Sequence, residues 1–151
     1  MHRFIPRLLL AACFTLGASL AHSQTNSPLR AADDRLYQAF GETAGLTALM
    51  DDFVKRLVAD KRIGSFFKDS NQAHLAQQLT EQLCMLSGGP CTYRGVPMKD
   101  AHADMDISKA DFNALVEVLQ VSMDAKGIPF AVQNRMLARL APMHREVMTK
   151  R

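Results

Sequence analysis

Several residue types and motifs that often define a function are absent from this chain. It has no tryptophan, and its 151 residues include only two tyrosines and three cysteines. No Cys-x-x-Cys or His-Glu-x-x-His sequence occurs, which argues against a zinc site made of protein side chains alone. The absence of a Glu-x-x-His pair argues against a di-iron bundle, and the absence of a Gly-x-Ser-x-Gly elbow argues against a serine hydrolase.

Charge of one sign is not concentrated in any segment. Lysines and arginines number 18 against 15 acidic residues, and they are scattered among the acids. Such a distribution is typical of a solvated surface, so we expect no nucleic-acid partner. The content of 48% hydrophobic and 22% charged residues indicates one globular domain. Nine methionines predict an adaptable aliphatic core that can enclose a flat apolar ligand.

The first 23 residues have the organisation of a cleavable signal peptide. Arg3 and Arg7 form a basic segment, residues 8–20 form an apolar segment, and residues 21–23 form a small-x-small cleavage sequence. We therefore expect the mature chain to begin near Gln24 and to be periplasmic or secreted.

A lipid anchor is the second interpretation of this region. Cys13 ends the sequence Leu-Ala-Ala-Cys, which resembles a lipoprotein box, but apolar residues continue beyond it to Leu20. No later apolar run approaches the roughly 20 residues of a membrane-spanning helix, so no membrane span is expected. The polar residues 24–32 predict a flexible tether, and residues 33–151 are expected to form the folded domain.

Apolar residues recur at helical spacing along the domain, and no segment alternates as a strand does. A brief helix is expected at residues 33–40, followed by longer helices at 43–59, 71–87, 108–126 and 129–147. Pro142 is expected to bend the last helix, because proline removes a helical hydrogen bond. The pattern predicts an all-α domain with a long irregular connection before its third long helix.

That connection contains the histidine with the most unusual setting. Glycines and prolines interrupt residues 88–97, and residues 98–105 then offer about two turns of helix that can aim His102. A single histidine is more often a packed or surface residue than a ligand. It is sufficient, however, when iron is already held by four porphyrin nitrogens, because the protein then supplies only an axial imidazole and an apolar slot.

A set of motifs in fixed order resembles one protein family. The motifs are LYQAFG, TALMDDFVKRLVADKRIGSFF, LSGGP, TYRGVPMKDAHADMDIS and LARLAPM. Their order and spacing over residues 36–148 are similar to those of the group 1 truncated haemoglobins, small bacterial globins built as two helices over two. The resemblance implies an all-α truncated-globin fold, a two-over-two helical sandwich around one haem per chain.

The resemblance assigns roles to individual residues. His102 is implied to bind the haem iron on the proximal side, and Phe67 is implied to pack on the porphyrin. Lys99 is implied to lie at the pocket edge, as a candidate partner for a haem propionate. The other implied pocket residues are Phe53, Leu75, Leu83, Tyr93, Met98, Ile107 and Phe112. Ordinary core packing is the alternative for the apolar ones.

Two features depart from the family pattern. Many members place a tyrosine in the second helix and a glutamine in the fourth to hydrogen-bond bound oxygen, but here those positions hold Val54 and Leu79. The ligand side of the pocket is therefore expected to be apolar, unless a modest rotation of the helix brings the amide of Gln78 inward. The second departure is that the family's Gly-Gly after the first helix is Gly41-Glu42.

The expected function is that of an exported haem-binding globin. Its partner is a diatomic ligand, namely oxygen, nitric oxide or carbon monoxide, and the sequence leaves any electron donor unidentified. The alternatives are a gas-sensing or haem-carrying interaction protein, a nitric oxide dioxygenase and a haem-free helical adaptor. Dioxygenation needs bound oxygen to persist, so Val54 and Leu79 weaken it, while His102 argues against the adaptor.

Cys84 and Cys91 form a candidate disulfide. Export places them in an oxidising compartment, and helical spacing places Cys84 on the polar face with Gln77 and Glu81. Two free thiols are equally compatible with the sequence.

Overall fold

The computed structural model describes residues 34–150, and the expected signal peptide and tether lie outside them. Within residues 34–150 the chain is helical and contains no strand. The elements are α2 (Arg35–Ala39), α3 (Glu42–Ala59), η1 (Gly64–Phe66), α4 (Gln72–Leu86), α5 (Met98–Ala101), α6 (Lys109–Ala125), α7 (Phe130–Leu140), η2 (Ala141–Met143) and α8 (His144–Val147). No helix in this part of the chain is long and apolar enough to cross a bilayer.

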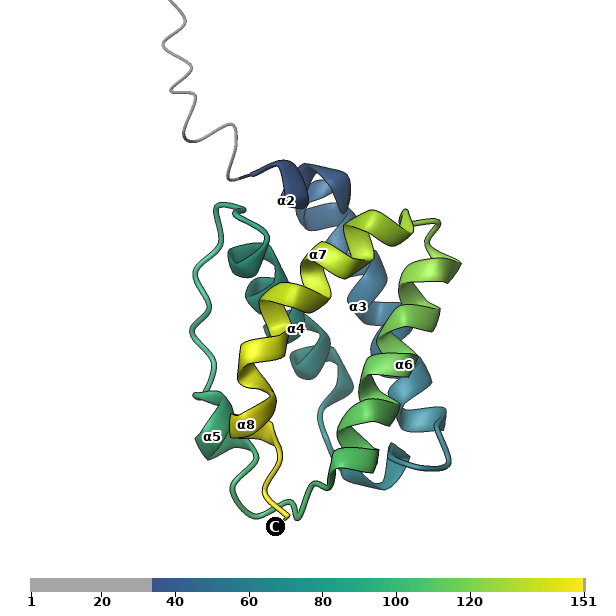
Figure 1. Ribbon diagram of the computed structural model, residues 1–151, viewed down its shortest axis with the longest axis vertical. Coiled ribbons are helices and arrows are strands. Elements are labelled where there is room, and N and C mark those ends of the chain that lie inside the picture. The colour runs from purple at the N-terminus through teal and green to yellow at the C-terminus, as the bar shows by residue number, and fades with distance from the viewer. Residues whose placement is uncertain (1–33, 151) are drawn as a thin grey trace, which may run out of the picture.

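The long helices form two pairs, α3 with α4 and α6 with α7. Helix α3 packs against both α4 and α6, and α7 contacts α4 and α6. Figure 1 shows α7 crossing in front of α3, with α4 on one side and α6 on the other, and α8 beside α5. The expected last helix is broken into α7, η2 and α8, and Pro142 lies in η2 as the sequence predicts. This arrangement is the two-over-two helical sandwich.

Helix α3 supplies the centre of the core. Its side chains Leu46, Leu49, Met50 and Leu57 are all at most 1% exposed. They pack with methionines from the second pair, of which Met123 and Met136 are completely buried. The core is therefore aliphatic and rich in methionine, as the composition predicts.

Helix α4 buries two faces. Ala76, Thr80 and Cys84, spaced four residues apart, are buried, and their small size allows a close approach to the neighbouring helix. The leucines at 75, 79 and 83 lie on another face. The Asn71 side chain caps the helix by accepting a hydrogen bond of 3.1 Å from the His74 N–H.

The corner between α2 and α3 explains the departure at Gly41-Glu42. Both residues adopt left-handed backbone conformations, with φ of 77° at Gly41 and 59° at Glu42. The same corner brings Gly45 so close to Phe40 that a Cβ on Gly45 would lie 1.9 Å from the Phe40 carbonyl oxygen. Glycine suits both positions of such a corner, because it has no Cβ to clash in the left-handed region. Glu42 adopts the same conformation with some steric strain, and the fold is unchanged.

Arg62 ties the end of α3 to α6. Its guanidinium donates to Asp60 at 2.9 Å and to Glu117 of α6 at 2.5 Å. The side-chain hydrogen bond from Arg62 lowers the pKa of Asp60 to about 2. This carboxylate therefore remains charged, and the bridge intact, through the ordinary pH range.

Helix α5 is shorter than the sequence predicts. It ends at Ala101 rather than near Met105, so the expectation of about two turns was wrong. The next residues form a turn in which the Met105 N–H donates to the His102 carbonyl at 3.2 Å, and Asp106 has a positive φ of 49°. The helix ends because His102 already departs from helical backbone angles, with φ of −119° and ψ of 4°.

Cys84 and Cys91 form a disulfide, with 5.7 Å between their Cα atoms. Cys84 is completely buried, so its expected place on a polar face was wrong. The bridge closes the turn after α4, where a Cβ on Gly89 would come within 2.7 Å of the Cys84 sulfur and 2.6 Å of the Tyr37 ring. It also joins α4 to the loop that leads to α5.

We predict that removing this bridge destabilises the fold. In the variant Cys84→Ala/Cys91→Ala, the free energy of unfolding should fall by about 2.5 kcal/mol, from the chain-entropy relation for so short a loop. Urea titration followed by circular dichroism measures this change. Reductant should destabilise the wild type similarly and leave the double variant unaffected. Quantitative alkylation of both cysteines in the unreduced native protein would contradict the bridge.

Candidate functional site

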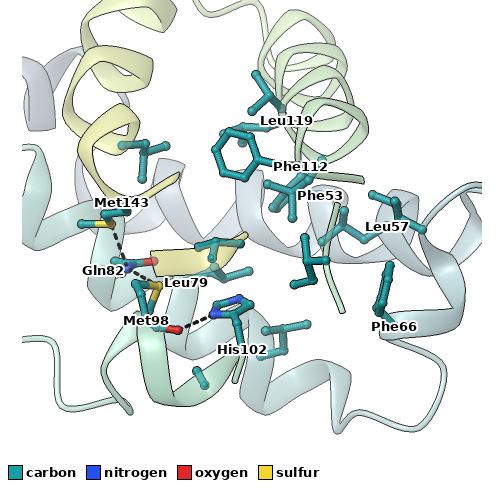
Figure 2. Close-up of a pocket in the computed structure, with 18 of the residues that line it drawn as sticks. Phe53, Leu57, Phe66, Leu79, Gln82, Met98, His102, Phe112, Leu119 and Met143 are labelled. Carbon is teal, nitrogen blue, oxygen red and sulfur yellow. Dashed lines mark hydrogen bonds between the residues drawn. The ribbon is translucent and has the colours of Figure 1, made fainter. Parts of the chain in front are cut away.

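A cavity of about 730 Å³ lies between the two pairs of helices and α5. This volume is within the range of roughly 300 to 1,000 Å³ of small-molecule and cofactor sites. Its walls are mostly apolar, and Figure 2 shows side chains from several helices directed toward one space. The expected residues that line it are Phe53, Phe67, Leu75, Leu79, Leu83, Tyr93, Met98, His102, Ile107 and Phe112.

His102 directs its imidazole into this cavity from the end of α5. Its Nδ1 lies 2.6 Å from the carbonyl oxygen of Met98. A carbonyl oxygen only accepts hydrogen bonds, so Nδ1 must carry the proton and donate. This tautomer leaves a lone pair on Nε2 for a metal, with the other ring nitrogen fixed by a backbone carbonyl as metal-binding histidines commonly have it.

His102 can supply only one ligand. Among residues 34–150, no group of three or more histidine, cysteine, aspartate or glutamate side chains is placed to hold a metal ion. A metal at this site must therefore bring its other ligands with it. A planar macrocycle that carries its own four nitrogens satisfies this requirement and suits apolar walls.

Two of the expected residues do not line the cavity. Val54 is 2% exposed and packs in the core, because a helix turns by about 100° per residue and Phe53 takes the inward direction. Lys99 is exposed on α5, one residue after the inward-facing Met98. Val54 is therefore not part of the cavity wall, and the structure gives Lys99 no contact there.

Helices α6 to α8 line the cavity more extensively than the sequence interpretation foresaw. The additional apolar residues include Leu115, Val116 and Leu119 of α6, Leu137 and Leu140 of α7, Met143 of η2 and Val147 of α8. Several of them belong to the apolar stripes that predicted these helices. Periodicity identifies such a stripe, but it does not distinguish a cavity wall from a closed core.

Two glutamines of α4 also belong to the wall, of which the sequence interpretation considered Gln78 as an alternative and missed Gln82. Gln78 and Gln82 both line the cavity. The Gln78 Oε1 atom is buried and has no hydrogen-bond partner. It lies beneath the loop before α5, where a Cβ on Gly95 would come 2.5 Å from it. The wall formed by α4 is therefore not wholly apolar.

Tyr93 and the C-terminal residues hold the segments that flank α5. The Tyr93 hydroxyl donates to the Val96 carbonyl oxygen at 3.1 Å, and burial together with the charge of Glu81 raises the pKa of this phenol. Beyond α5, the Ile107 N–H donates to the Thr149 hydroxyl at 2.9 Å. The N–H groups of Thr149 and Lys150 both donate to the Ile107 carbonyl.

Two helical pairs that enclose an apolar cavity with one inward histidine define a globin of the two-over-two class. A profile of the bacterial-like globins matches residues 35–149. The chain belongs to this family, and its relatives place it among the group 1 truncated haemoglobins.

The relatives cover most of the described domain. The group 1 truncated haemoglobin of Tetrahymena pyriformis is 34% identical over 99 residues, which is 66% of this chain and 82% of that protein. The group 1 truncated haemoglobin GlbN of Mycolicibacterium paratuberculosis is 28% identical over 114 residues, 76% of this chain and 84% of that protein.

Solved structures agree with this assignment. The crystal structure of the ferric Tetrahymena pyriformis protein superposes with a TM-score of 0.73 and 30% identity, over 76% of this chain and 98% of that one. The two-over-two haemoglobin of Synechococcus, solved with covalently attached haem, gives a TM-score of 0.71 at 20% identity over the same shares. The latter likeness concerns the fold alone.

Proposed function

We propose that this chain binds one haem in the cavity and that His102 Nε2 is the proximal ligand of its iron. The observation that carries the proposal is the fixed imidazole: Nδ1 donates to the Met98 carbonyl and the ring faces an apolar cavity of cofactor size. Family membership supports the same cofactor. Bound haem supplies an iron atom with a position open to a diatomic ligand such as oxygen, nitric oxide or carbon monoxide.

The residues of this chain bind and shield that group. The proton on His102 Nδ1 stays engaged with the Met98 carbonyl, which fixes the ring and raises the basicity of Nε2. Phe53, Phe67 and Phe112 offer apolar surface to a flat ligand. Such walls exclude water and make polar contacts inside the cavity stronger.

The α4 wall is the proposed ligand side. Leu75 and Leu79 offer no hydrogen-bond donor, whereas Gln78 brings a primary amide to the same wall. Because its Oε1 has no protein partner, turning the Gln78 amide toward a ligand breaks no hydrogen bond at that atom. We favour ligand binding over nitric oxide dioxygenation, because Leu79 removes a donor that would retain oxygen.

Export through the predicted signal peptide is the second part of the proposal. Residues 1–23 lie outside the described residues, so the sequence pattern carries this part. The Cys84–Cys91 disulfide supports it, because such bonds persist mainly in oxidising compartments.

We predict that His102→Ala weakens haem binding by roughly tenfold or more, because it removes the bond between protein and iron. The visible absorption spectrum of the purified protein, reduced and with carbon monoxide, reports haem and its axial ligation. The matched controls are His74→Ala at the exposed start of α4 and His144→Ala, whose ring packs edge-on to Phe112 at a centroid distance of 6.2 Å. Loss of haem from His144→Ala but not from His102→Ala would refute the assignment.

We predict that Gln78→Ala releases oxygen about five- to tenfold faster than the wild type, the effect of losing one hydrogen bond of about 1 to 1.4 kcal/mol. Stopped-flow displacement of oxygen by carbon monoxide measures this rate. Leu79→Gln should slow release by adding a donor to the same wall. If Gln78→Ala and the wild type release oxygen equally fast, the ligand side is functionally apolar.

We predict that the protein recovered from the periplasm or medium begins close to Gln24. Intact-mass spectrometry and N-terminal peptide mapping identify this end. A diacylglyceryl group on Cys13 would instead establish the lipid anchor.

A further inference from the structure

Gln82 is a buried polar residue of the cavity wall to which the proposed function assigns no role. This side chain lies on α4, lines the cavity and is only 5% exposed. Burying a primary amide without hydrogen bonds is costly, so its partners indicate what it does.

Those partners are two methionine sulfurs from other parts of the fold. The Nε2 atom of Gln82 lies 3.4 Å from the sulfur of Met98 and 3.7 Å from the sulfur of Met143. Figure 2 shows the amide between the two thioethers, with dashed lines to both. Gln82 therefore joins α4 to α5 and to η2 by N–H donation to sulfur, an acceptor that is weak but usable inside a protein.

Met98 connects this cluster to the imidazole. Its sulfur accepts from Gln82, and its carbonyl oxygen accepts from His102 Nδ1 at 2.6 Å. Helix α5, on which Met98 lies, has only four residues, no buried residue and no side-chain N-cap. Helix α8 also contacts α5, but among residues 34–150 Gln82 is the side chain of another helix that hydrogen-bonds to it. A displacement of Met98 would also displace the carbonyl that orients His102.

We propose that Gln82 is a positioning residue for His102, acting through Met98. The inference rests on the proposed function, because orienting His102 matters only if the imidazole ligates iron. Gln82 itself does not touch the iron; it holds the backbone acceptor that sets the tautomer and direction of the ligand. The alternative is that Gln82 only fills space, with its contacts to sulfur incidental.

The test compares Gln82→Leu with a matched control on the same helix. Gln77→Leu makes the same chemical change at an exposed position, where the amide donates to Glu81 at 3.2 Å. Circular dichroism and thermal unfolding establish that each variant folds. If Gln82→Leu fails to fold, Met98→Leu and Met143→Leu remove one sulfur acceptor each with little change of volume and continue the test.

Two readouts respond to the orientation of His102. In haem-free protein, ¹⁵N NMR of the His102 ring reports the tautomer, and Gln82→Leu should lose the single Nδ1–H form. In the reduced haem-loaded protein, the iron–histidine stretching band should shift or broaden, and haem transfer to an acceptor globin should be about fivefold faster. Combining Gln82→Leu with Met98→Leu should add little to either change alone, because both act on one contact.

The outcomes separate this inference from the proposed function. If the wild type and Gln77→Leu bind no haem, the proposed function fails. If they bind haem and Gln82→Leu keeps the wild-type band, ring tautomer and transfer rate, or if Gln77→Leu alters them equally, the positioning role is refuted.

Discussion

The arrangement of the site depends on one hydrogen bond, from the His102 imidazole to the Met98 carbonyl. Helix α5 carries both groups but buries no residue of its own, so core packing does not fix its position. Contacts from outside do so: the disulfide tethers the loop before α5, and the C-terminal residues hold Ile107 after it. The chain therefore stabilises the orientation of His102, the proposed iron ligand, by restraining the loops around it, because α5 is too short to be fixed by burial alone.

The helices and the cavity were predictable to different degrees. The 3.6-residue repeat predicts α3, α4 and α6 within a few residues, because each must bury one face to be stable. The same repeat does not reveal that Leu119 or Leu137 lines a cavity rather than a closed core. That distinction depends on the distance between neighbouring helices, and the spacing of residues along one helix gives no information about that distance. Only the resemblance to a haem protein supplied it before the structure.

Two side chains of α4 show why spacing and residue type can mislead. Gln82 is polar, yet it lies seven residues after Leu75 and three after Leu79, on the leucine face of α4. Cys84 lies three residues after Glu81 and four after Thr80, so its spacing fits the polar face on which it was expected as well as the buried series of small side chains that it continues. The early end of α5 is different, because it depends on the backbone angles of His102, which ordinary propensities do not foresee.

The α4 wall of the cavity keeps polar side chains, although not at position 79. Leu79 stands where the family resemblance implies a glutamine, yet amides occur one residue before it and three residues after it, and both line the cavity. They are not equivalent. The amide nitrogen of Gln82 donates to two methionine sulfurs. The Oε1 of Gln78 has no partner, so the Gln78 amide can turn without breaking a hydrogen bond at that atom. In the proposed haem complex, Gln78 is therefore the α4 amide available to a ligand, while Gln82 is proposed to act on the histidine side.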